Sequence, residues 1–314
     1  MTPRLLELLV CPACKGELVL RTEGSASGDV QTGTLTCSAC VAAYPIVRGI
    51  PRFVGQDTYA ESFGDEWHRF RTVQLDSANG TTESADGFAL KTGLGPGDVR
   101  GRLVLDAGVG AGRYAEVMAQ WGAEVVGVDL TRAVDAAAQN LRLWPTAHLV
   151  QADIFALPFR DETFDICYSI GVLHHTPDTA AAFGRVAGMV RKGGYLAVYV
   201  YHAGGLARYI SDTFRALTTR VPRPVVYYAS MASVPLYFLH RAPLIGRVSQ
   251  VFLPTSAHPD WRWRWLDTFD WYSPRYQWKH RYPEVLGWFR EAGFSDLYVA
   301  DEPICIRGLK VSAR

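Results

Sequence analysis

The segment "LDAGVGAGRY" at Leu105–Tyr114 contains the pattern that decides the fold of this chain. It joins an apolar run to three glycines with the spacing G-x-G-x-G, at Gly108, Gly110 and Gly112. Glycines let the backbone turn sharply and approach a ligand, and the N-terminus of the helix expected next attracts negative charge. A nicotinamide dinucleotide fingerprint has its third glycine one position later, so this loop differs from that motif.

The residues around this loop alternate between apolar runs and amphipathic stretches. Expected strands rich in β-branched residues cover 102–108, 123–130, 147–153, 164–170, 193–201, 296–300 and 304–311. Expected helices cover 112–122, 132–143, 179–190 and 282–294. Strands separated by helices favour a parallel sheet that is covered on both faces. The sequence therefore predicts a doubly wound α/β domain with 201–280 inserted after the fifth strand, over the edge where ligands bind.

Further motifs follow the ends of the expected strands. Asp129 ends the second strand, where its carboxylate could accept hydrogen bonds from both hydroxyls of a ribose. Asp153 and Ile154 follow the third strand, where a carboxylate and an adjacent amide could hold an adenine ring. The motif "GVLHH" closes the fourth strand and "VRKGGYLAV" opens the fifth. In this order, the motifs resemble those of class I S-adenosylmethionine-dependent methyltransferases, in the branch of ubiquinone and menaquinone biosynthesis.

The resemblance covers about 101–201 and 281–314, and it implies a Rossmann-like seven-stranded sheet with S-adenosyl-L-methionine as cofactor. Asp106 and the glycine loop would hold the methionine part of the cofactor. The segment "SFGDEW" at 62–67 resembles a stretch that closes over the cofactor in relatives. The implied cofactor contacts are Phe63, Trp67, Asp106, Gly108, Gly110, Gly112, Asp129, Leu130, Asp153, Ile154, Ile170 and Gly171. Structural roles stay open, as caps of strand ends or turns for the aspartates and as packing for the aromatic residues.

Four cysteines within the first 55 residues form two C-x2-C pairs that are 22 residues apart. They are Cys11, Cys14, Cys37 and Cys40. Four thiolates can surround Zn²⁺ tetrahedrally in a closed structural site, whereas a cytoplasmic setting disfavours the alternative of two disulfides. The motifs "CPACKGEL", "LTCSAC" and "YPIVRGIP" resemble short zinc-ribbon proteins that activate RNA and protein methyltransferases. We expect a zinc ribbon at 1–55 and a helical connector with a cofactor lid at 56–100, and we expect Cys167 and Cys305 to pack in the core.

Charge and hydropathy point to a cytoplasmic protein with one unusual segment. The net charge is +1 and 48% of the residues are hydrophobic, while the apolar runs are too short for a signal peptide or a spanning helix. The segment 201–280 contains ten arginines and lysines but only four acidic residues, all of them aspartates. Its apolar run at 225–240 is interrupted by Pro235, which favours a buried or interfacial helix. Lipid contact through 217–253 stays open.

The end of this segment, "DWRWRWLDTFDWYSPRYQWKH" at 260–280, holds five of the nine tryptophans. If 260–265 is extended, Trp261, Trp263 and Trp265 share one face, which would make an aromatic wall with a charged rim beside the methyl-donor cleft. Core packing of these tryptophans is the alternative. We expect the stretch to form the last part of an acceptor-binding insertion.

Methyl transfer from a sulfonium requires alignment of the acceptor and, for a hydroxyl acceptor, a side chain that removes a proton. The candidates for this base are His175, His202, Asp270 and Tyr272. Asp270 and Tyr272, together with Tyr276, are also the expected acceptor contacts. At least one of His174 and His175 would instead order the loop after the fourth strand.

Three classes of function are compatible with these features. The favoured class is a methyltransferase for a small-molecule acceptor, such as a natural product, sugar or lipid-like molecule, with O-methylation slightly preferred. The second is an RNA or protein methyltransferase that reads its substrate through the ribbon, although the ribbon has few basic residues. The third is a non-catalytic binding module, which the intact set of cofactor motifs disfavours.

Overall fold

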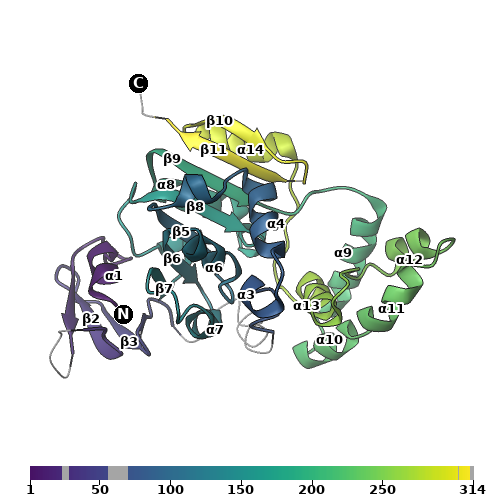
Figure 1. Cartoon of the computed structure of the whole chain (residues 1–314), viewed down its shortest axis with the longest axis horizontal. Helices are drawn as coiled ribbons and strands as arrows, with labels where there is room; N and C mark the ends of the chain where they lie inside the picture. The colour runs from purple at the N-terminus through teal and green to yellow at the C-terminus, as the bar shows by residue number, and fades with distance from the viewer. Residues whose placement is uncertain (23–27, 56–69, 303, 312–314) are drawn as a thin grey trace.

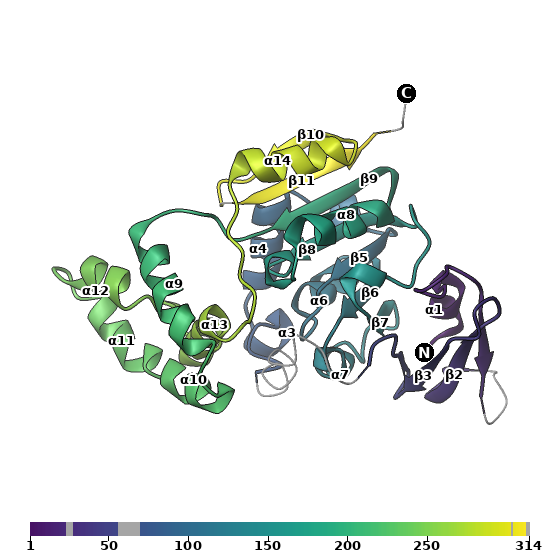
Figure 2. The ribbon, with the colours of Figure 1, turned by 180° about the vertical axis from the view of Figure 1, so that it is seen from behind.

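The computed structural model describes residues 1–22, 28–55, 70–302 and 304–311. A small sheet lies at one end of the molecule, a large sheet covered by helices lies in the middle, and a layer of helices lies at the other end (Figure 1). The reverse view shows the same separation (Figure 2). Among the residues that the structure describes, the helices are too short or too polar to cross a lipid bilayer.

The large sheet has seven strands in the order β10-β11-β9-β8-β5-β6-β7. The strands are β5 (Leu103–Ala107), β6 (Glu124–Asp129), β7 (Ala147–Gln151), β8 (Phe164–Ile170), β9 (Val190–Tyr199), β10 (Phe294–Val299) and β11 (Cys305–Lys310). Strands β5 to β9 pair in parallel, whereas β10 and β11 are antiparallel. The predicted doubly wound fold with seven strands is confirmed.

Both faces of this sheet are buried because helices cover both. The covering helices are α4 (Glu83–Thr92), α6 (Arg113–Gln120), α7 (Ala133–Asn140), α8 (Thr179–Met189) and α14 (Tyr282–Glu291). On strand β5, Val104 packs in the core beneath α4, α6 and α7, and the next residue, Leu105, packs in the core beneath α8 and α14. Successive side chains of a strand point to opposite faces, so an unbroken apolar run supplies both cores.

The N-terminal ribbon contains α1 (Pro3–Leu8), β1 (Leu18–Arg21), β2 (Thr32–Cys37), β3 (Ala43–Val47) and β4 (Ile50–Pro51). Its apolar side chains, including Leu5 and Leu35, join the core beneath α8. Its backbone also contacts the edge of the large sheet, where the Phe53 amide donates a hydrogen bond of 2.8 Å to the Gln151 carbonyl. The ribbon therefore contacts the sheet domain both through buried apolar side chains and through backbone hydrogen bonds.

The described part of the connector contains α3 (Asp76–Asn79), α4 and α5 (Pro96–Val99). The Asp76 carboxylate accepts hydrogen bonds from the backbone amides of Ser84 and Ala85, both at 2.9 Å, which fixes the start of α4. The expected lid residues Phe63 and Trp67 lie outside the described residues.

The insertion after the fifth strand is helical. It contains α9 (Leu206–Thr218), α10 (Arg223–Ser230), α11 (Ser233–His240), α12 (Gly246–Phe252) and α13 (Trp261–Tyr272). The apolar run that was expected to form one helix is divided between α10 and α11, with a turn between them.

The extended conformation considered for 260–265 is wrong, because α13 begins at Trp261. The Asp260 carboxylate caps this helix by accepting from the amides of Arg262 and Trp263. Trp261 and Trp265 therefore lie on one side of the helix, with their ring centroids 6.5 Å apart, whereas Trp263 lies on another side. Trp263 is buried and stacks on His258 at 4.3 Å, Trp265 donates to the Tyr227 carbonyl at 2.9 Å, and Trp261 is exposed.

Candidate active site and metal centre

A cavity of about 300 Å³ lies at the carboxyl ends of β5, β6, β8 and β9. The glycine loop after β5 and the turn after β6 line one side. Residues of β9 and α13 line the other side. The cavity thus occupies the edge of the sheet at which doubly wound folds bind ligands, and the insertion supplies one of its walls.

The glycine loop can exist only with glycine at its first position. Gly108 has φ +105°, and a Cβ atom there would lie 2.4 Å from Cγ2 of Val172. The Gly110 amide donates a hydrogen bond of 3.0 Å to the Asp129 carboxylate. The loop is therefore held close to the end of β6, with its backbone facing the cavity.

We expect Gly108→Ala to lower the free energy of unfolding by about 2–4 kcal/mol, because it adds both backbone strain and a clash with Val172. Thermal unfolding monitored by circular dichroism measures the effect. The matched control is Gly184→Ala on the exposed side of α8, where a Cβ atom meets no neighbour. That variant should be as stable as the native chain or slightly more stable. Equal stability of the two variants would contradict the described loop geometry.

The Asp129 carboxylate lines the cavity and accepts three hydrogen bonds. Besides the Gly110 amide, it accepts from the Thr131 amide at 2.9 Å and from the Thr131 hydroxyl at 2.7 Å. Burial raises the pKa of Asp129, and these hydrogen bonds act in the opposite direction. The carboxylate is thus fixed in place at the end of β6, facing the cavity.

Asp106 lies behind the cavity wall instead of lining it. It is buried and accepts a hydrogen bond of 2.8 Å from the Tyr168 hydroxyl. Burial raises the pKa of Asp106 to about 7, although the hydrogen bond from Tyr168 favours its ionised form. Asp153 caps the short 3₁₀ helix η1 (Ile154–Ala156) by accepting from the Phe155 amide at 3.0 Å.

The structure brings most of the expected cofactor residues to one cavity. Those that line it are Gly108, Gly110, Asp129, Leu130, Ile154, Ile170 and Gly171. The side chain of Asp106, the N-cap Gly112 of α6 and the capping residue Asp153 lie outside this lining. The arrangement offers a carboxylate for ribose hydroxyls and exposed loop backbone, which fits a nucleoside-containing cofactor.

Of the four candidate bases, His175 and Asp270 line the cavity. His202 and Tyr272 do not line it, and the Tyr272 hydroxyl instead donates to the Pro254 carbonyl at 2.6 Å. Nδ1 of His175 lies 2.9 Å from the Tyr276 carbonyl oxygen. A carbonyl only accepts, so Nδ1 carries the hydrogen and Nε2 is the acceptor atom of the ring. Burial lowers the pKa of His175 to about 4, which keeps the ring neutral.

Three further residues line this end of the cavity and were missed by the sequence reasoning. They are Tyr199, Tyr201 and Asp267. Burial raises the pKa of Asp267 to about 6, and its carboxylate accepts a hydrogen bond of 3.0 Å from the Ser256 hydroxyl. The tyrosines at i and i+2 lie at the end of the fifth strand, and Asp267 lies one helical turn before Asp270. Both spacings were visible in the sequence.

A second cavity of about 420 Å³ adjoins the first. Tyr199 and Tyr201 line both cavities, so the two spaces meet at these side chains. The second cavity lies among α9, α12, α13 and the segment that follows α13, and its lining includes Ser211, Gln250 and Trp271. The insertion therefore adds a separate space beside the cavity at the strand ends.

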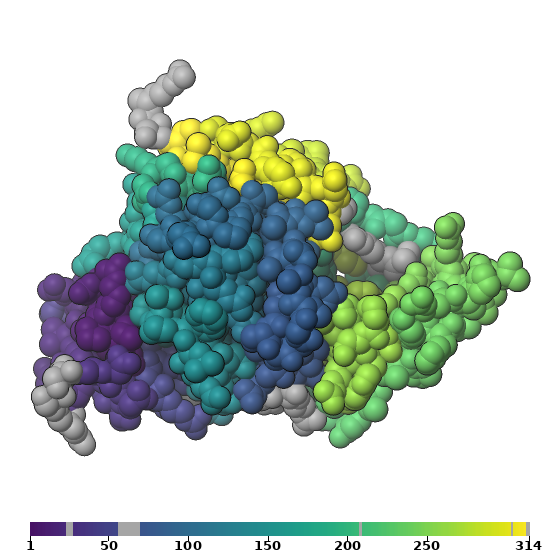
Figure 3. Space-filling model, in the orientation of Figure 1, coloured from purple at the N-terminus to yellow at the C-terminus, as the bar shows by residue number. Residues whose placement is uncertain are grey.

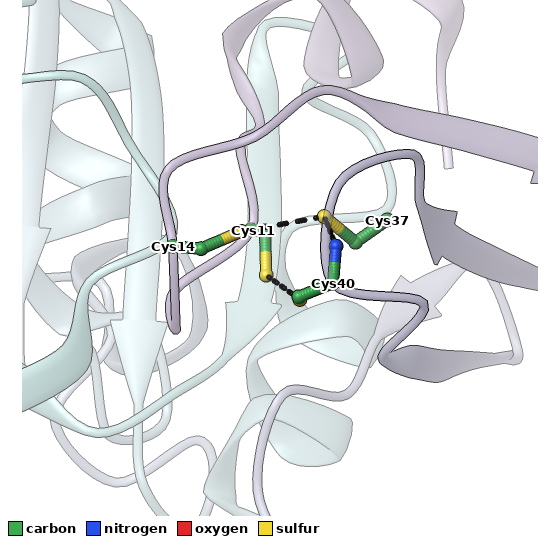
Figure 4. A group of neighbouring side chains, drawn as sticks. All are labelled: Cys11, Cys14, Cys37 and Cys40. Atoms are coloured by element: carbon green, nitrogen blue, oxygen red, sulfur yellow. Dashed lines mark hydrogen bonds between the residues drawn. The ribbon is translucent and has the colours of Figure 1, made fainter.

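The ribbon holds a compact cluster of four thiols (Figure 4). Their sulfur atoms all lie within 4.8 Å of one another, with Cys11 and Cys40 3.6 Å apart. Four Zn–S bonds of about 2.3 Å in a tetrahedron require sulfur–sulfur distances of about 3.8 Å. All six cysteines are free thiols, and Cys167 and Cys305 are buried as expected. The cluster therefore fits a tetrahedral metal ion with no coordination position left for a substrate.

Comparison with protein families agrees with both sites. A model described as a methyltransferase domain matches residues 105–198, and a model described as Trm112p-like protein matches residues 2–49. An uncharacterized methyltransferase of Mycobacterium sp. (strain JLS) is 33% identical over 57% of this chain and 73% of its own length. The ubiquinone biosynthesis O-methyltransferase of Alkalilimnicola ehrlichii is 36% identical over 32% of this chain. The chain spans 42% of the length of that relative.

Among solved structures, a Burkholderia thailandensis 1,6-didemethyltoxoflavin-N1-methyltransferase with bound S-adenosylhomocysteine is 18% identical, with a TM-score of 0.45. The match covers 90% of this chain and 97% of that one. The assignment itself rests on the sequence matches and on the cavity at the strand ends. The chain belongs to the class I S-adenosylmethionine-dependent methyltransferases and carries a Trm112p-like ribbon on its N-terminal side.

Proposed function

We propose that the protein transfers a methyl group from S-adenosyl-L-methionine to a small-molecule acceptor, with an oxygen atom as the favoured site. The observation that carries this proposal is the junction of two cavities at Tyr199 and Tyr201. Most of the expected cofactor residues line the first cavity, and the second is large enough for a separate ligand. The relative from Alkalilimnicola, named as an O-methyltransferase of ubiquinone biosynthesis, supports the choice of oxygen.

S-adenosylmethionine, when bound, supplies an electrophilic methyl group. In our proposal the Asp129 carboxylate and the glycine loop bind and orient the cofactor. The two tyrosines hold the acceptor at the junction and exclude water. Asp267 is the preferred proton acceptor, because a base is most effective when its pKa lies near the working pH, and burial brings the pKa of Asp267 to about 6. Asp270, which lies one turn further along α13, orients the acceptor hydroxyl.

An RNA or protein acceptor read by the ribbon is the alternative. The ribbon packs at the β7 edge, whereas the insertion that lines the cavity lies at the opposite end of the molecule (Figures 1 and 2). We therefore propose that the ribbon is a structural element with zinc as its metal, and that it does not contact the acceptor. Free thiols at a metal site suit a reducing compartment, which supports the cytoplasm as the location.

Turnover of quinol, phenol and sugar acceptors with labelled S-adenosylmethionine tests this function. For an accepted substrate, we expect Asp267→Asn to lower kcat by about 10²–10⁴-fold, because it removes the base, while affinity for S-adenosylhomocysteine stays within about twofold. Asp161→Asn, at an exposed turn, is the control and should keep full turnover. Methylation of RNA or protein but of no small acceptor would contradict the proposal. Unchanged kcat in Asp267→Asn would exclude Asp267 as the base.

A further inference from the structure

Helix α9 turns a polar face toward the rest of the insertion and an apolar face toward the solvent. On the inner side, the guanidinium of the buried Arg215 donates to the carbonyls of Trp271 and Pro274, at 3.0 and 2.7 Å. On the outer side, Leu206, Tyr209 and Leu217 are 61–72% exposed. Their spacing places them along one stripe of the helix. An amphipathic helix normally buries its apolar stripe, so the outward stripe of α9 indicates a partner.

The tip formed by α11 and α12 also has exposed apolar side chains. Phe238 is 75% exposed, Leu244 between the two helices is 92% exposed, and Val248 is 57% exposed. Helix α9 packs against α12. The space-filling view shows these helices extending beyond the sheet domain (Figure 3). We call the three side chains of α9 and the three side chains of the tip the apolar insertion surface. Exposed apolar side chains gathered on neighbouring helices mark an interaction site.

The charges around the apolar insertion surface have one sign. Residues 206–253 contain six arginines and a single acidic residue, Asp212. Asp212 is already paired with Lys279. The arginines at 220, 223, 241 and 247 are exposed, and the last two flank Leu244. Exposed apolar side chains bordered by arginine complement a surface that is both apolar and negatively charged.

We propose that the apolar insertion surface docks on an anionic lipid bilayer. A second copy of this chain is the competing partner, but a two-fold contact would place the same arginines against one another. The helices of the insertion would lie on the bilayer, in agreement with their length. Because Ser211 of α9 and Gln250 of α12 line the second cavity, docking holds that cavity beside the lipid. This docking does not depend on the proposed methyl transfer.

Flotation of the full zinc-loaded chain with lipid vesicles tests the proposal. We expect the protein to float with phosphatidylcholine vesicles that contain one third phosphatidylglycerol. It should not float with pure phosphatidylcholine, and binding should weaken near 1 M salt, where the Debye length falls to ~3 Å. Arg241→Gln with Arg247→Gln should weaken binding by about thirtyfold, since each basic residue contributes about fivefold.

The apolar contribution is tested by Leu244→Glu with Val248→Glu, for which we expect a loss of binding on the order of 100-fold. The matched control is Val41→Glu with Leu143→Glu. These side chains are 79% and 78% exposed but lie outside the insertion. The control should float like the native chain, and circular dichroism verifies that both variants are folded.

Three outcomes would overturn the proposal. One is the absence of flotation by the folded native chain on anionic vesicles. Another is a dimer in light scattering that becomes monomeric in Leu244→Glu with Val248→Glu, because the surface would then bind a second copy. Equal binding by these variants and by the control pair would also exclude the surface.

Discussion

Asp129→Ala should weaken the binding of S-adenosylhomocysteine by at least about 100-fold. The carboxylate is held in place by the Gly110 amide and by the amide and hydroxyl of Thr131, and it faces the cavity at the end of β6. Hydrogen bonds to a charged group contribute about 1.5–3 kcal/mol each, and the two hydroxyls of a ribose would provide two of them. Titration calorimetry measures the dissociation constant.

The control must separate loss of the ribose contact from damage to the glycine loop. Thr131→Val removes one donor to Asp129 but leaves the carboxylate in the cavity. We expect it to weaken binding by less than about tenfold, since one hydrogen bond contributes about 1 kcal/mol. If Asp129→Ala, while folded, binds S-adenosylhomocysteine as tightly as the native chain, Asp129 does not hold the cofactor.

Replacement of one ribbon thiol should have the largest effect on stability. We expect the native chain to contain about one zinc ion and Cys11→Ser to contain almost none, since four thiolates form the site. Structural zinc contributes on the order of 10 kcal/mol to the folding of small zinc domains, so the ribbon should unfold without it. Because Leu5 and Leu35 share the core beneath α8, the unfolding temperature of the whole chain should also fall.

Elemental analysis gives the metal content, and calorimetry gives the unfolding temperature. Cys305→Ser is the matched control, because this buried thiol lies outside the cluster. It should lose some stability through its buried hydroxyl but keep the full metal content. A chelator should reproduce the effect of Cys11→Ser on the native chain. Full metal content in Cys11→Ser would contradict a site with four thiolate ligands.

The parts of the fold that were predictable are those that local rules specify. The glycine spacing after β5 identified the loop, because the left-handed backbone at Gly108 admits no larger residue without strain. The apolar runs identified the buried strands, since both faces of the sheet are covered. The spacing of the two C-x2-C pairs identified the thiol cluster, which needs only short turns to bring each pair together.

The parts that were not predictable depend on tertiary contacts. The alternation W-R-W-R-W at 261–265 suggests a strand, but the Asp260 cap and packing against α10 and α11 make it helical. The cap was the local signal that could have indicated a helix. Tyr272 was an expected acceptor contact, yet its hydroxyl is bound to the Pro254 carbonyl. No sequence pattern shows in which direction a single side chain of a helical insertion points.

The outward orientation of the apolar stripe of α9 also depends on tertiary contacts. The sequence shows an amphipathic helix, and the usual interpretation buries its apolar side. In the structure, Arg215 and Thr218 use the polar side to bind carbonyls of α13 and of the segment that follows it. The helix therefore turns its apolar side outward, and only the assembled insertion reveals this orientation.

A crystal structure of the chain with S-adenosylhomocysteine tests the central claim most directly. We predict electron density in the cavity at the carboxyl ends of the parallel strands, with the ribose hydroxyls on the Asp129 carboxylate and the sulfur facing the junction at Tyr199 and Tyr201. Binding of the ligand at any other position, or an empty cavity at saturating ligand, would contradict the account.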